Sequence, residues 1–384
     1  MDNLLKEYEN TDFNKNNFLE NKEKILINFH RSAKVEVINN RSTGAKYKIN
    51  FIDRSSGATV CSNTISENCW LSTNELYYKD WRVEVFKNDK LIVNHELNLN
   101  GKNVNIVFDS KSVGDTIAWI PQVEKFRKTH NCNLYVSTFH NHLFKNSYPQ
   151  INFFEPNAGS HRVHYEWWIG VYMDKISNHH PTDWRKLPLH QIGAEQLGMK
   201  NSPEIKCKID DPPKINFLEG QKYVCISNSS TAGCKHWQNK NGWQDVVDHL
   251  NSIGYKVVLV QREKLPWMDL PELKNVIHPE INNTLEASSL IKGCEFFIGL
   301  SSGMSWLAWG LNKKVILISG FTGSFHEFHT PHRLINEDVC NSCWHDTNHL
   351  FDRGDWNWCP KNKDFECSKS ISSNKVINEI NKLV

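Results

Sequence analysis

Four cysteines near the C-terminus have the spacing of a metal site. Cys340 and Cys343 form a Cys-x-x-Cys pair, Cys359 follows after fifteen intervening residues, and Cys367 lies eight positions beyond it. Four thiolates at such spacing predict a closed tetrahedral site for one structural metal ion per chain. This chemistry favours zinc, and tetrahedral sulfur also suits a single iron ion.

Several histidines close to these cysteines suggest a second, catalytic metal site. They are His326, His329, His332, His345 and His349. Because the chain contains 18 histidines, we interpret this group as a chance cluster with hydrogen-bonded surface roles. The four-cysteine site is then the predicted metal site, and it leaves no open position for a substrate.

Three loops that follow predicted strands contain small polar residues suited to catalysis or anion binding. The first, SVGDT at residues 112–116, places Asp115 and Thr116 at the start of a predicted helix. Asp115 there is either an N-cap that also stabilises the helix dipole or a catalytic carboxylate. From this loop alone, capping is the better interpretation.

The other two loops are candidates for binding phosphate. Residues 227–235, SNSSTAGCK, contain Thr231 and end in the cation Lys235. The pattern is not a Walker A motif, and a solvated turn is an equal alternative. Residues 299–305, GLSSGMS, place Ser301, Ser302 and Gly303 at the start of an apolar helix. Backbone N–H groups at a helix N-terminus attract anions.

The segments around these loops predict an α/β protein of three parts. Residues 25–102 alternate apolar and polar side chains between turns, which predicts a small antiparallel β barrel or sandwich. Residues 103–212 and 213–384 alternate strand and helix signals, which predicts two facing Rossmann-like domains. The Pro-containing stretch 210–220 is the predicted linker. Residues 1–24, rich in Asn, Lys and Glu, are a predicted flexible arm.

The composition excludes two classes of protein. Lys and Arg total 45 against 43 Asp and Glu, so no charge excess is present with which to bind nucleic acid. No stretch approaches the roughly 20 apolar residues that span a bilayer, and the N-terminus lacks the apolar core of a signal peptide. Eleven cysteines, an odd number, favour reduced thiols and a cytoplasmic location.

Five motifs in a fixed order give the chain a resemblance to a known family. They are FDSKSVGDTIAWIP, YVCISNSSTAGCKHW with GWQDVVDHL, FFIGLSSGMSWLAW, VILISGF, and VCNSCWHD with GDWNWCP and FEC. On these motifs the chain resembles the autotransporter O-heptosyltransferases, which are related to the lipopolysaccharide heptosyltransferases. The resemblance implies a GT-B fold and inverting transfer of heptose from ADP-heptose to Ser or Thr hydroxyls of an autotransporter adhesin passenger domain.

The resemblance also implies roles for the candidate residues. Asp115 matches the acidic residue that takes the proton of the acceptor hydroxyl as a general base. The implied nucleotide-binding residues are Thr116, Thr231, Lys235, Ser301, Ser302 and Gly303. The last three stand where the lipopolysaccharide enzymes typically have Asp-Thr-Gly, which agrees with the protein-modifying branch. The family favours Fe(III) over Zn(II) at the four cysteines.

Three further points concern cofactors, rival functions and assembly. No Asp-x-Asp pair occurs in a suitable loop, so we expect no catalytic divalent cation. A glycosyltransferase of the same fold with another sugar nucleotide or a saccharide acceptor is one alternative. A non-catalytic binding module that grips a partner through the cysteine knuckle is another, although the intact GDTIAWIP loop opposes it. We also expect a homo-oligomer.

Overall fold

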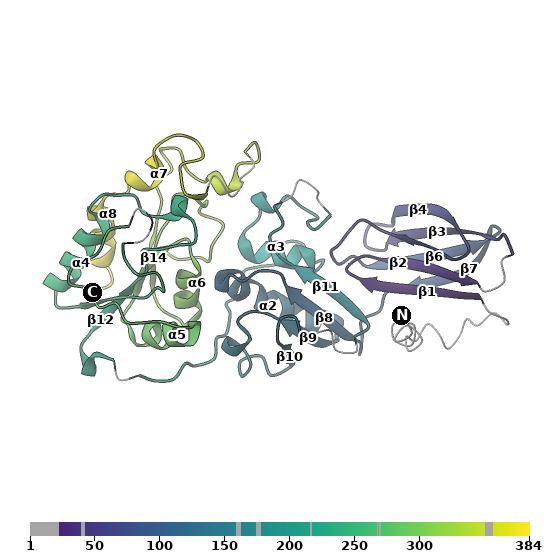
Figure 1. Ribbon diagram of the computed structural model, residues 1–384, viewed down its shortest axis with the longest axis horizontal. Helices are drawn as coiled ribbons and strands as arrows, with labels where there is room; N and C mark the ends of the chain where they lie inside the picture. The colour runs from purple at the N-terminus through teal and green to yellow at the C-terminus, as the bar shows by residue number, and fades with distance from the viewer. Residues whose placement is uncertain are drawn as a thin grey trace.

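The protein consists of three parts arranged along its long axis (Figure 1). The computed structural model describes residues 23–39, 43–158, 163–173, 178–215, 217–266, 268, 270–349 and 356–384. A β part comes first in the chain, a central α/β part follows, and a C-terminal α/β part ends the chain. The predicted arm, residues 1–24, lies outside the described residues except for Glu23 and Lys24, which begin the first strand.

The N-terminal part is built of antiparallel strands, as the alternating pattern predicts. The strands are β1 (Glu23–His30), β2 (Lys34–Asn39), β3 (Lys46–Asp53), β4 (Ala58–Ser66), β5 (Cys69–Ser72), β6 (Trp81–Lys87) and β7 (Lys90–Glu96). Four of them form a sheet in the order β4-β3-β6-β7. In β3, Tyr47, Ile49 and Phe51 are fully buried while Lys46 and Lys48 are exposed, because successive side chains of a strand point to opposite faces.

The central part is a parallel sheet with helices packed on it. Its elements are β8 (Asn103–Phe108), α2 (Val113–His130), β9 (Asn133–Ser137), β10 (Ile151–Phe154), β11 (Tyr165–Ile169) and α3 (Leu189–Gln196). The strands β10, β9, β8 and β11 pair in parallel, which confirms the predicted Rossmann-like arrangement.

The central sheet does not stop at the predicted domain boundary at residue 102. β1 pairs in parallel with β11, with Phe29 opposite Tyr165, and the resulting seven-stranded sheet has the order β10-β9-β8-β11-β1-β2-β5. Phe29 is 1% exposed, and its ring lies 5.8 Å from that of Tyr165. β1 pairs with the edge of β11, which would otherwise be exposed to solvent. The first two parts therefore share one sheet and one hydrophobic core.

The C-terminal part is a second parallel sheet. Its elements are β12 (Tyr223–Ile226), α4 (Gly242–Ser252), β13 (Lys256–Leu259), α5 (Thr284–Gly293), β14 (Phe297–Leu300), α6 (Gly303–Gly310), β15 (Val315–Ile318), β16 (Arg333–Leu334), α7 (Glu366–Lys369) and α8 (Ser373–Ile380). The strand order is β13-β12-β14-β15-β16. The order reverses between β12 and β14, and loops at such a switch point bind ligands beyond the carboxyl ends of the strands.

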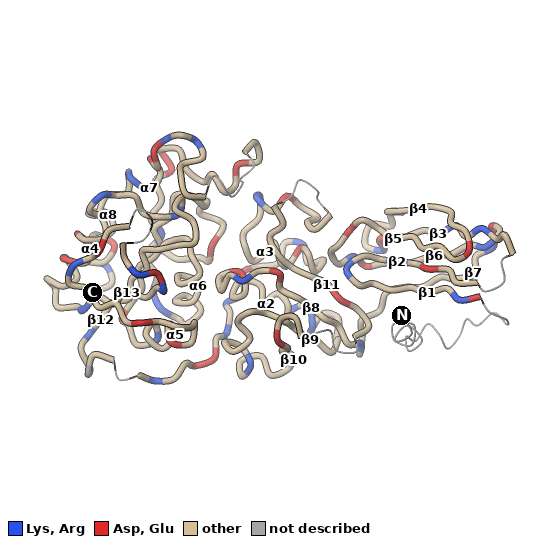
Figure 2. Tube along the Cα trace, viewed as in Figure 1, with Lys and Arg blue, Asp and Glu red and all other residues tan. Residues whose placement is uncertain are grey.

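Charges of both signs are interspersed along the whole trace (Figure 2). No part of the described chain gathers Lys and Arg into a single tract. Among the helices that the structure describes, none has both the length and the apolar character needed to cross a bilayer.

Helices α2 and α6 join the central and C-terminal parts, and they touch at two glycines. A Cβ atom on Gly114 would lie 3.5 Å from Cα of Gly303 and 2.9 Å from Cδ1 of Trp306. The Trp306 ring is itself held by Trp309 and Phe328, with ring centroids 5.6 and 5.0 Å away. The N-termini of the two helices can approach so closely only because both residues lack a side chain.

We therefore predict that Gly114→Ala disturbs the junction of the two parts. The added methyl group collides with a ring that has no room to rotate, so we expect a loss of about 1–3 kcal/mol in the free energy of unfolding. Thermal denaturation measures this change, and Lys128→Ala at the exposed end of the same helix serves as the control. An unchanged midpoint of thermal denaturation in Gly114→Ala would show that the junction of the two helices has room for a methyl group.

Candidate active site

A cleft of about 700 Å³ separates the central part from the C-terminal part. The central part contributes the loop between β8 and α2 and the residues that follow β11. The C-terminal part contributes loops that follow β12, β14 and β15. A second cavity of about 340 Å³ adjoins the cleft. The two share Lys111, Ser112, Thr231, Lys235, Ser302 and Gly303.

The structure brings all but one of the predicted catalytic and nucleotide-binding residues to this cleft. Its lining includes Asp115, Thr231, Lys235, Ser301, Ser302 and Gly303. Thr116 is not among the lining residues: its side chain is fully buried, and its hydroxyl donates to the carbonyl of Ser112 at 3.0 Å. Asp115 faces the cleft, whereas the next side chain of the same helix, Thr116, points into the protein interior.

Asp115 occupies the first turn of α2 without capping it. The cap is Ser112, whose Oγ accepts from the Asp115 backbone N–H at 3.4 Å. The Asp115 carboxylate instead accepts a hydrogen bond from Ser110 Oγ at 2.6 Å. The structure thus assigns the capping hydrogen bond to Ser112, and the Asp115 side chain faces the cleft.

The surroundings of Asp115 make its carboxylate more basic than usual. Burial raises its pKa, while the hydrogen bond from Ser110 and the positive charge of Lys235 oppose the change; burial prevails. The carboxylate is partly exposed to the cleft and enclosed by protein on its other sides. A carboxylate with a raised pKa is a better proton acceptor, as a general base requires.

Positive charge converges on the boundary between the cleft and the second cavity. Lys235 interacts electrostatically with Asp115, and its ammonium forms no ion pair or hydrogen bond with another described residue. The N-termini of α2 and α6 meet at the same place. Ser302 stands at the N-cap position of α6, and its buried hydroxyl has no hydrogen-bond partner within the described chain. Two helix N-termini, an ammonium and an unused hydroxyl form an anion site.

The loop that follows β12 lines the second cavity, and hydrogen bonds to polar side chains hold it in place. Gln261 accepts hydrogen bonds from the backbone N–H groups of Asn228 and Ser229 at 3.2 and 3.1 Å. Ser229 Oγ donates to Glu263 at 3.0 Å. Apolar side chains, among them Val260 and Ile281, complete the lining. This mixture of apolar surface with a few fixed polar groups is typical of a nucleoside pocket.

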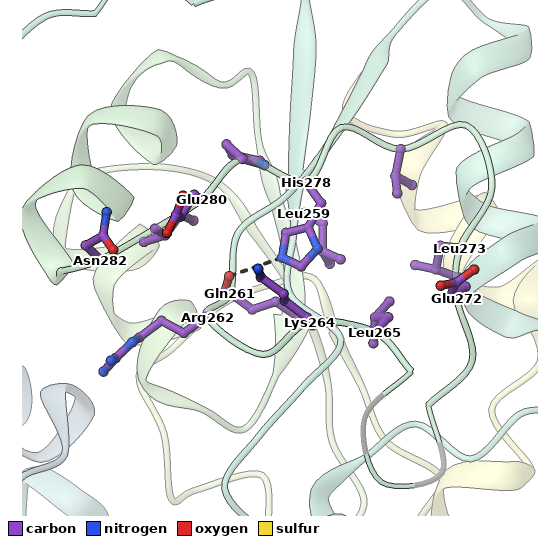
Figure 3. A pocket seen from close by; sticks show the side chains of 13 residues that line it. Leu259, Gln261, Arg262, Lys264, Leu265, Glu272, Leu273, His278, Glu280 and Asn282 are labelled. Atoms are coloured by element: carbon purple, nitrogen blue, oxygen red, sulfur yellow. Dashed lines mark hydrogen bonds between the residues drawn. The ribbon is translucent and has the colours of Figure 1, made fainter.

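A third cavity, of about 610 Å³, continues beyond the second one (Figure 3). The two adjoin at Gln261, Arg262 and Ile281, which line both. Figure 3 shows the ring of His278 beside the carbonyl of Gln261, with 3.3 Å between Nε2 and the oxygen. None of the residues predicted for catalysis or binding lines this cavity.

A chain of buried hydrogen bonds fixes the C-terminal wall of the cleft. Ser301 Oγ lies 2.6 Å from Thr322 Oγ1, which donates to Glu327 at 2.7 Å. The other Glu327 oxygen pairs with Arg333 at 2.8 Å. Burial raises the pKa of Glu327, but the charges of His326 and Arg333 and the hydrogen bonds from Thr322 and Arg333 together lower it below the usual value. Ser301 thus holds its loop in place, and no sequence motif had pointed to Thr322 or Glu327.

His326 corrects the interpretation of the nearby histidines as surface residues. Its side chain is 7% exposed and lines the cleft. We call the stretch from Cys340 to Cys367 the cysteine-rich segment. Two of its tryptophans, Trp344 and Trp356, line the same region of the cleft. Trp344 and Trp356 follow no helical or strand pattern in the sequence. Their position close to Cys343 and Cys359 was the one sequence feature that could have indicated a role for them.

The four predicted metal ligands lie near one another but not in a closed shell. In the part of the chain that the structure describes, no three His, Cys, Asp or Glu side chains are close enough to hold a metal ion. Burial is the main cause that raises the pKa of Cys343 to about 12, and the charges of Cys340, Cys367 and Cys359 contribute to the same rise. Burial likewise raises the pKa of Cys367 to about 11, with added effects of Cys359 and Cys340.

The donor set nevertheless suits a soft metal ion. Mutual repulsion of clustered thiolates is relieved by a cation, and thiolate is the ligand that iron and zinc share. The backbone N–H of Lys363 donates to Sγ of Cys359 at 3.2 Å, a contact that stabilises a thiolate. The Cys-x-x-Cys turn and Cys367 both pack on Gly320, where a Cβ would lie 3.1 Å from Sγ of Cys367.

The cysteine-rich segment also touches both sides of the cleft. The backbone of Asn357 lies against Gly233, in the loop that carries Lys235. Across the cleft, Arg185 of the central part donates to the carbonyl oxygens of Asp346 and Thr347 at 3.3 and 3.1 Å. The segment is therefore a wall of the cleft and a bridge between the two α/β parts.

These features define a class of protein. Two parallel α/β sheets face each other, one supplies a basic carboxylate, and the other supplies an anion site beside a nucleoside-sized cavity. This is the arrangement of a GT-B-like transferase.

Comparisons with known proteins identify the family. Residues 169–349 match glycosyltransferase family 9 (heptosyltransferase). The autotransporter heptosyltransferase BAHTCr of Citrobacter rodentium is 32% identical, with 94% of this chain and 89% of the relative covered. Aah of Escherichia coli is 33% identical over 88% of this chain and 89% of its own. The chain belongs to the autotransporter heptosyltransferases and is a glycosyltransferase, which confirms the resemblance seen in its motifs.

The structure agrees with this assignment. It superposes on the crystal structure of TibC, an iron-containing dodecameric glycosyltransferase of enterotoxigenic E. coli, with a TM-score of 0.85 and 30% identity. The match covers 94% of this chain and 95% of TibC. TibC in complex with ADP-D-β-D-heptose gives a TM-score of 0.84 at 29% identity.

Proposed function

We propose that the protein transfers heptose from ADP-heptose to Ser or Thr hydroxyls of an autotransporter adhesin, with inversion and with Asp115 as general base. One observation carries the proposal. Asp115 from the central part and Lys235 from the C-terminal part meet across one cleft, which gives a proton acceptor beside a site for a diphosphate. The complex of TibC with ADP-D-β-D-heptose supports the choice of donor, and the names of the relatives support the acceptor.

In this proposal the cleft and the second cavity each have a role in the reaction. The adenosine occupies the second cavity, and its diphosphate lies at Lys235 and the helix N-termini of α2 and α6. The acceptor hydroxyl attacks the anomeric carbon of heptose and forms the glycosidic bond, while the bond to the diphosphate breaks and ADP leaves. Asp115 takes the hydroxyl proton, and the positive groups at Lys235 stabilise the charge on the leaving group. Attack on the face opposite to ADP inverts the anomeric centre.

The metal has no step in this mechanism. We assign Cys340, Cys343, Cys359 and Cys367 as ligands of one Fe(III) ion per chain, with Zn(II) as the alternative, and TibC is an iron-containing relative. Such an ion supplies folding free energy to the cysteine-rich segment. We further propose a homo-oligomer, because TibC is dodecameric, and a cytoplasmic location, because all eleven cysteines, which lie in the described part of the chain, are free thiols.

The proposal predicts a defect in donor binding for Lys235→Ala. A charged hydrogen bond to phosphate contributes about 1.5–3 kcal/mol, so we expect ADP affinity to fall roughly tenfold to a hundredfold. Calorimetric titration with ADP measures this change, and Lys240→Ala, at an exposed position five residues along the chain, is the control. EDTA should leave the transfer rate unchanged. A requirement for added magnesium or manganese would contradict the assignment of Lys235.

The function itself is tested by mass spectrometry. The protein is incubated with a β-helical passenger fragment and one sugar nucleotide at a time. We expect the fragment to gain the mass of heptose with ADP-heptose alone. A gain with another sugar nucleotide, or transfer only to a saccharide, would replace the proposed substrates by those of the alternative transferase.

A further inference from the structure

Ser110 is a polar side chain on the cleft to which the mechanism above gives no role. It lies in the loop between β8 and α2, and its hydroxyl oxygen is 2.6 Å from Oδ2 of Asp115. The side chain lines the cleft and is partly exposed. Its contact with the proposed base makes Ser110 a candidate for controlling how that base is held.

The direction of this hydrogen bond is fixed by a second one. The backbone N–H of Ser112 donates to Oγ of Ser110 at 3.1 Å. Because an N–H group only donates, Oγ uses a lone pair there and keeps its own proton for Asp115. An ionised carboxylate only accepts, and 2.6 Å is typical of a hydroxyl that donates to a charged oxygen. Ser110 therefore donates to Oδ2 in the state in which Asp115 acts as a base.

The backbone on both sides of Ser110 is anchored within the central part. The N–H of Asp109 donates to the carbonyl of Ile169, at the end of β11, at 2.9 Å. On the helix side, the carbonyl of Ser112 accepts from the N–H and the hydroxyl of Thr116 at 3.2 and 3.0 Å. The serine hydroxyl and the first turn of α2 are thus held on one structural unit.

An aspartate side chain needs such a contact to act as a base from a defined position. Its χ2 torsion has a broad, two-fold distribution, so without a partner the carboxylate plane has no single orientation. A displacement of about 1 Å in a reacting group can slow a reaction about 100-fold. Ser112 has a smaller effect on the same carboxylate than Ser110, and its Oγ caps the helix by accepting the Asp115 N–H. Ser110 is therefore the main orienting partner.

We propose that Ser110 is a positioning residue of the transferase: its hydroxyl holds Oδ2 of Asp115, so that Oδ1 takes the proton of the acceptor hydroxyl. This inference rests on the proposed function, since it takes Asp115 as the base. The proton moves from the acceptor oxygen to Oδ1 as that oxygen bonds to the anomeric carbon, and Ser110 keeps its own proton. The two carboxylate oxygens then have different tasks, one in orientation and one in proton transfer.

Ser110→Ala is expected to slow the transfer step without weakening donor binding. The variant loses the hydrogen bond that orients the base, so the single-turnover rate of transfer to a passenger fragment should fall about 10- to 100-fold. ADP affinity should stay within about twofold of wild type, because the orientation of the base matters only in the transition state. Ser110→Thr keeps the hydroxyl and should restore most of the rate. Ser252→Ala, which removes an exposed hydroxyl bonded to a backbone carbonyl outside the cleft, is the matched control.

The pH dependence of the single-turnover rate separates positioning from a merely structural role. Transfer requires ionised Asp115, so the rate falls as the pH drops through the pKa of this group. Burial raises that pKa, and the Ser110 hydrogen bond lowers it, as do the charge of Lys235 and the Ser112 hydroxyl. Loss of the Ser110 bond should therefore move the fall in rate to higher pH in Ser110→Ala and not in Ser110→Thr. A less stable loop alone would slow transfer at every pH.

A double variant gives a second test. Because Ser110 acts through Asp115, adding Ser110→Ala to Asp115→Asn should not reduce the residual rate further. Two losses of rate that multiply would overturn the inference. A Ser110→Ala variant whose rate falls at the same pH as that of wild type would overturn it as well. Wild-type protein that transfers no heptose, or an Asp115→Asn variant with full activity, would instead refute the proposed function.

Discussion

Asp115→Asn is expected to reduce the rate of heptose transfer by about two to four orders of magnitude, which is the usual contribution of a positioned general base. The amide has nearly the same shape and still accepts the hydrogen bond from Ser110, but it cannot take a proton. Steady-state transfer to a passenger fragment measures the effect. Binding of ADP should be nearly unchanged, since Lys235 and the helix N-termini remain.

The stability of the same variant separates catalysis from helix capping. Folding raises the pKa of Asp115, so its contribution to stability is greatest below the ordinary aspartate pKa and declines as the pH rises through the raised value. Removing the charge should therefore leave the melting temperature at neutral pH unchanged or higher. Asp245→Asn, in the first turn of α4 and away from the cleft, is the matched control. If the two variants lose stability alike and both keep transfer activity, Asp115 only stabilises its helix.

Cys343→Ser is expected to remove the metal from the protein. Wild-type protein should contain about one tightly bound ion per chain, and four-cysteine sites fail when one thiolate is lost. Elemental analysis measures the ion, and ferric iron adds a red-brown colour that zinc does not. Cys132→Ser, which changes an equally buried thiol outside the cluster, should keep the ion.

The same substitution should lower thermal stability, because binding of the ion stabilises only the folded chain. The cysteine-rich segment carries Trp344 and Trp356 to the cleft and Asp346 to Arg185, so transfer should slow. It should remain measurable in any folded sample, since no step uses the metal. Wild-type protein prepared without chelators that holds no stoichiometric metal would refute the four-cysteine site.

Strands and helices of this protein could be predicted from the sequence wherever the pattern is local. Alternation in β3 and the apolar run in β14 mark these strands, and small residues mark the loop before α6. The pairing of β1 with β11 could not be predicted, because alternation shows which face of a strand is buried but not which strand lies beside it. Only the folded chain brings Phe29 to Tyr165.

The site residues divide in the same way into those that a local sequence motif predicts and those that contacts with distant residues position. The loops with Asp115, Lys235 and Ser302 follow strands of the two parallel sheets, and loops at the carboxyl ends of such strands are where ligands bind. Thr116 directly follows Asp115 in α2, and only the folded structure shows that its side chain is buried. His326 could not be found from a local motif, because it lies outside regular structure and is positioned by a contact with Leu189.

The parallel pairing of β1 with β11 has a consequence for the nascent chain during translation. β1 emerges before the other strands that the structure describes, and β2 can join it at once as a hairpin partner. Its other edge stays open until Tyr165 and Glu166 have been translated, since these residues pair with Phe29 and His30. During that interval the nascent chain presents an unpaired strand edge beside an apolar aromatic ring, the kind of surface that chaperones recognise and that pairs wrongly with other chains.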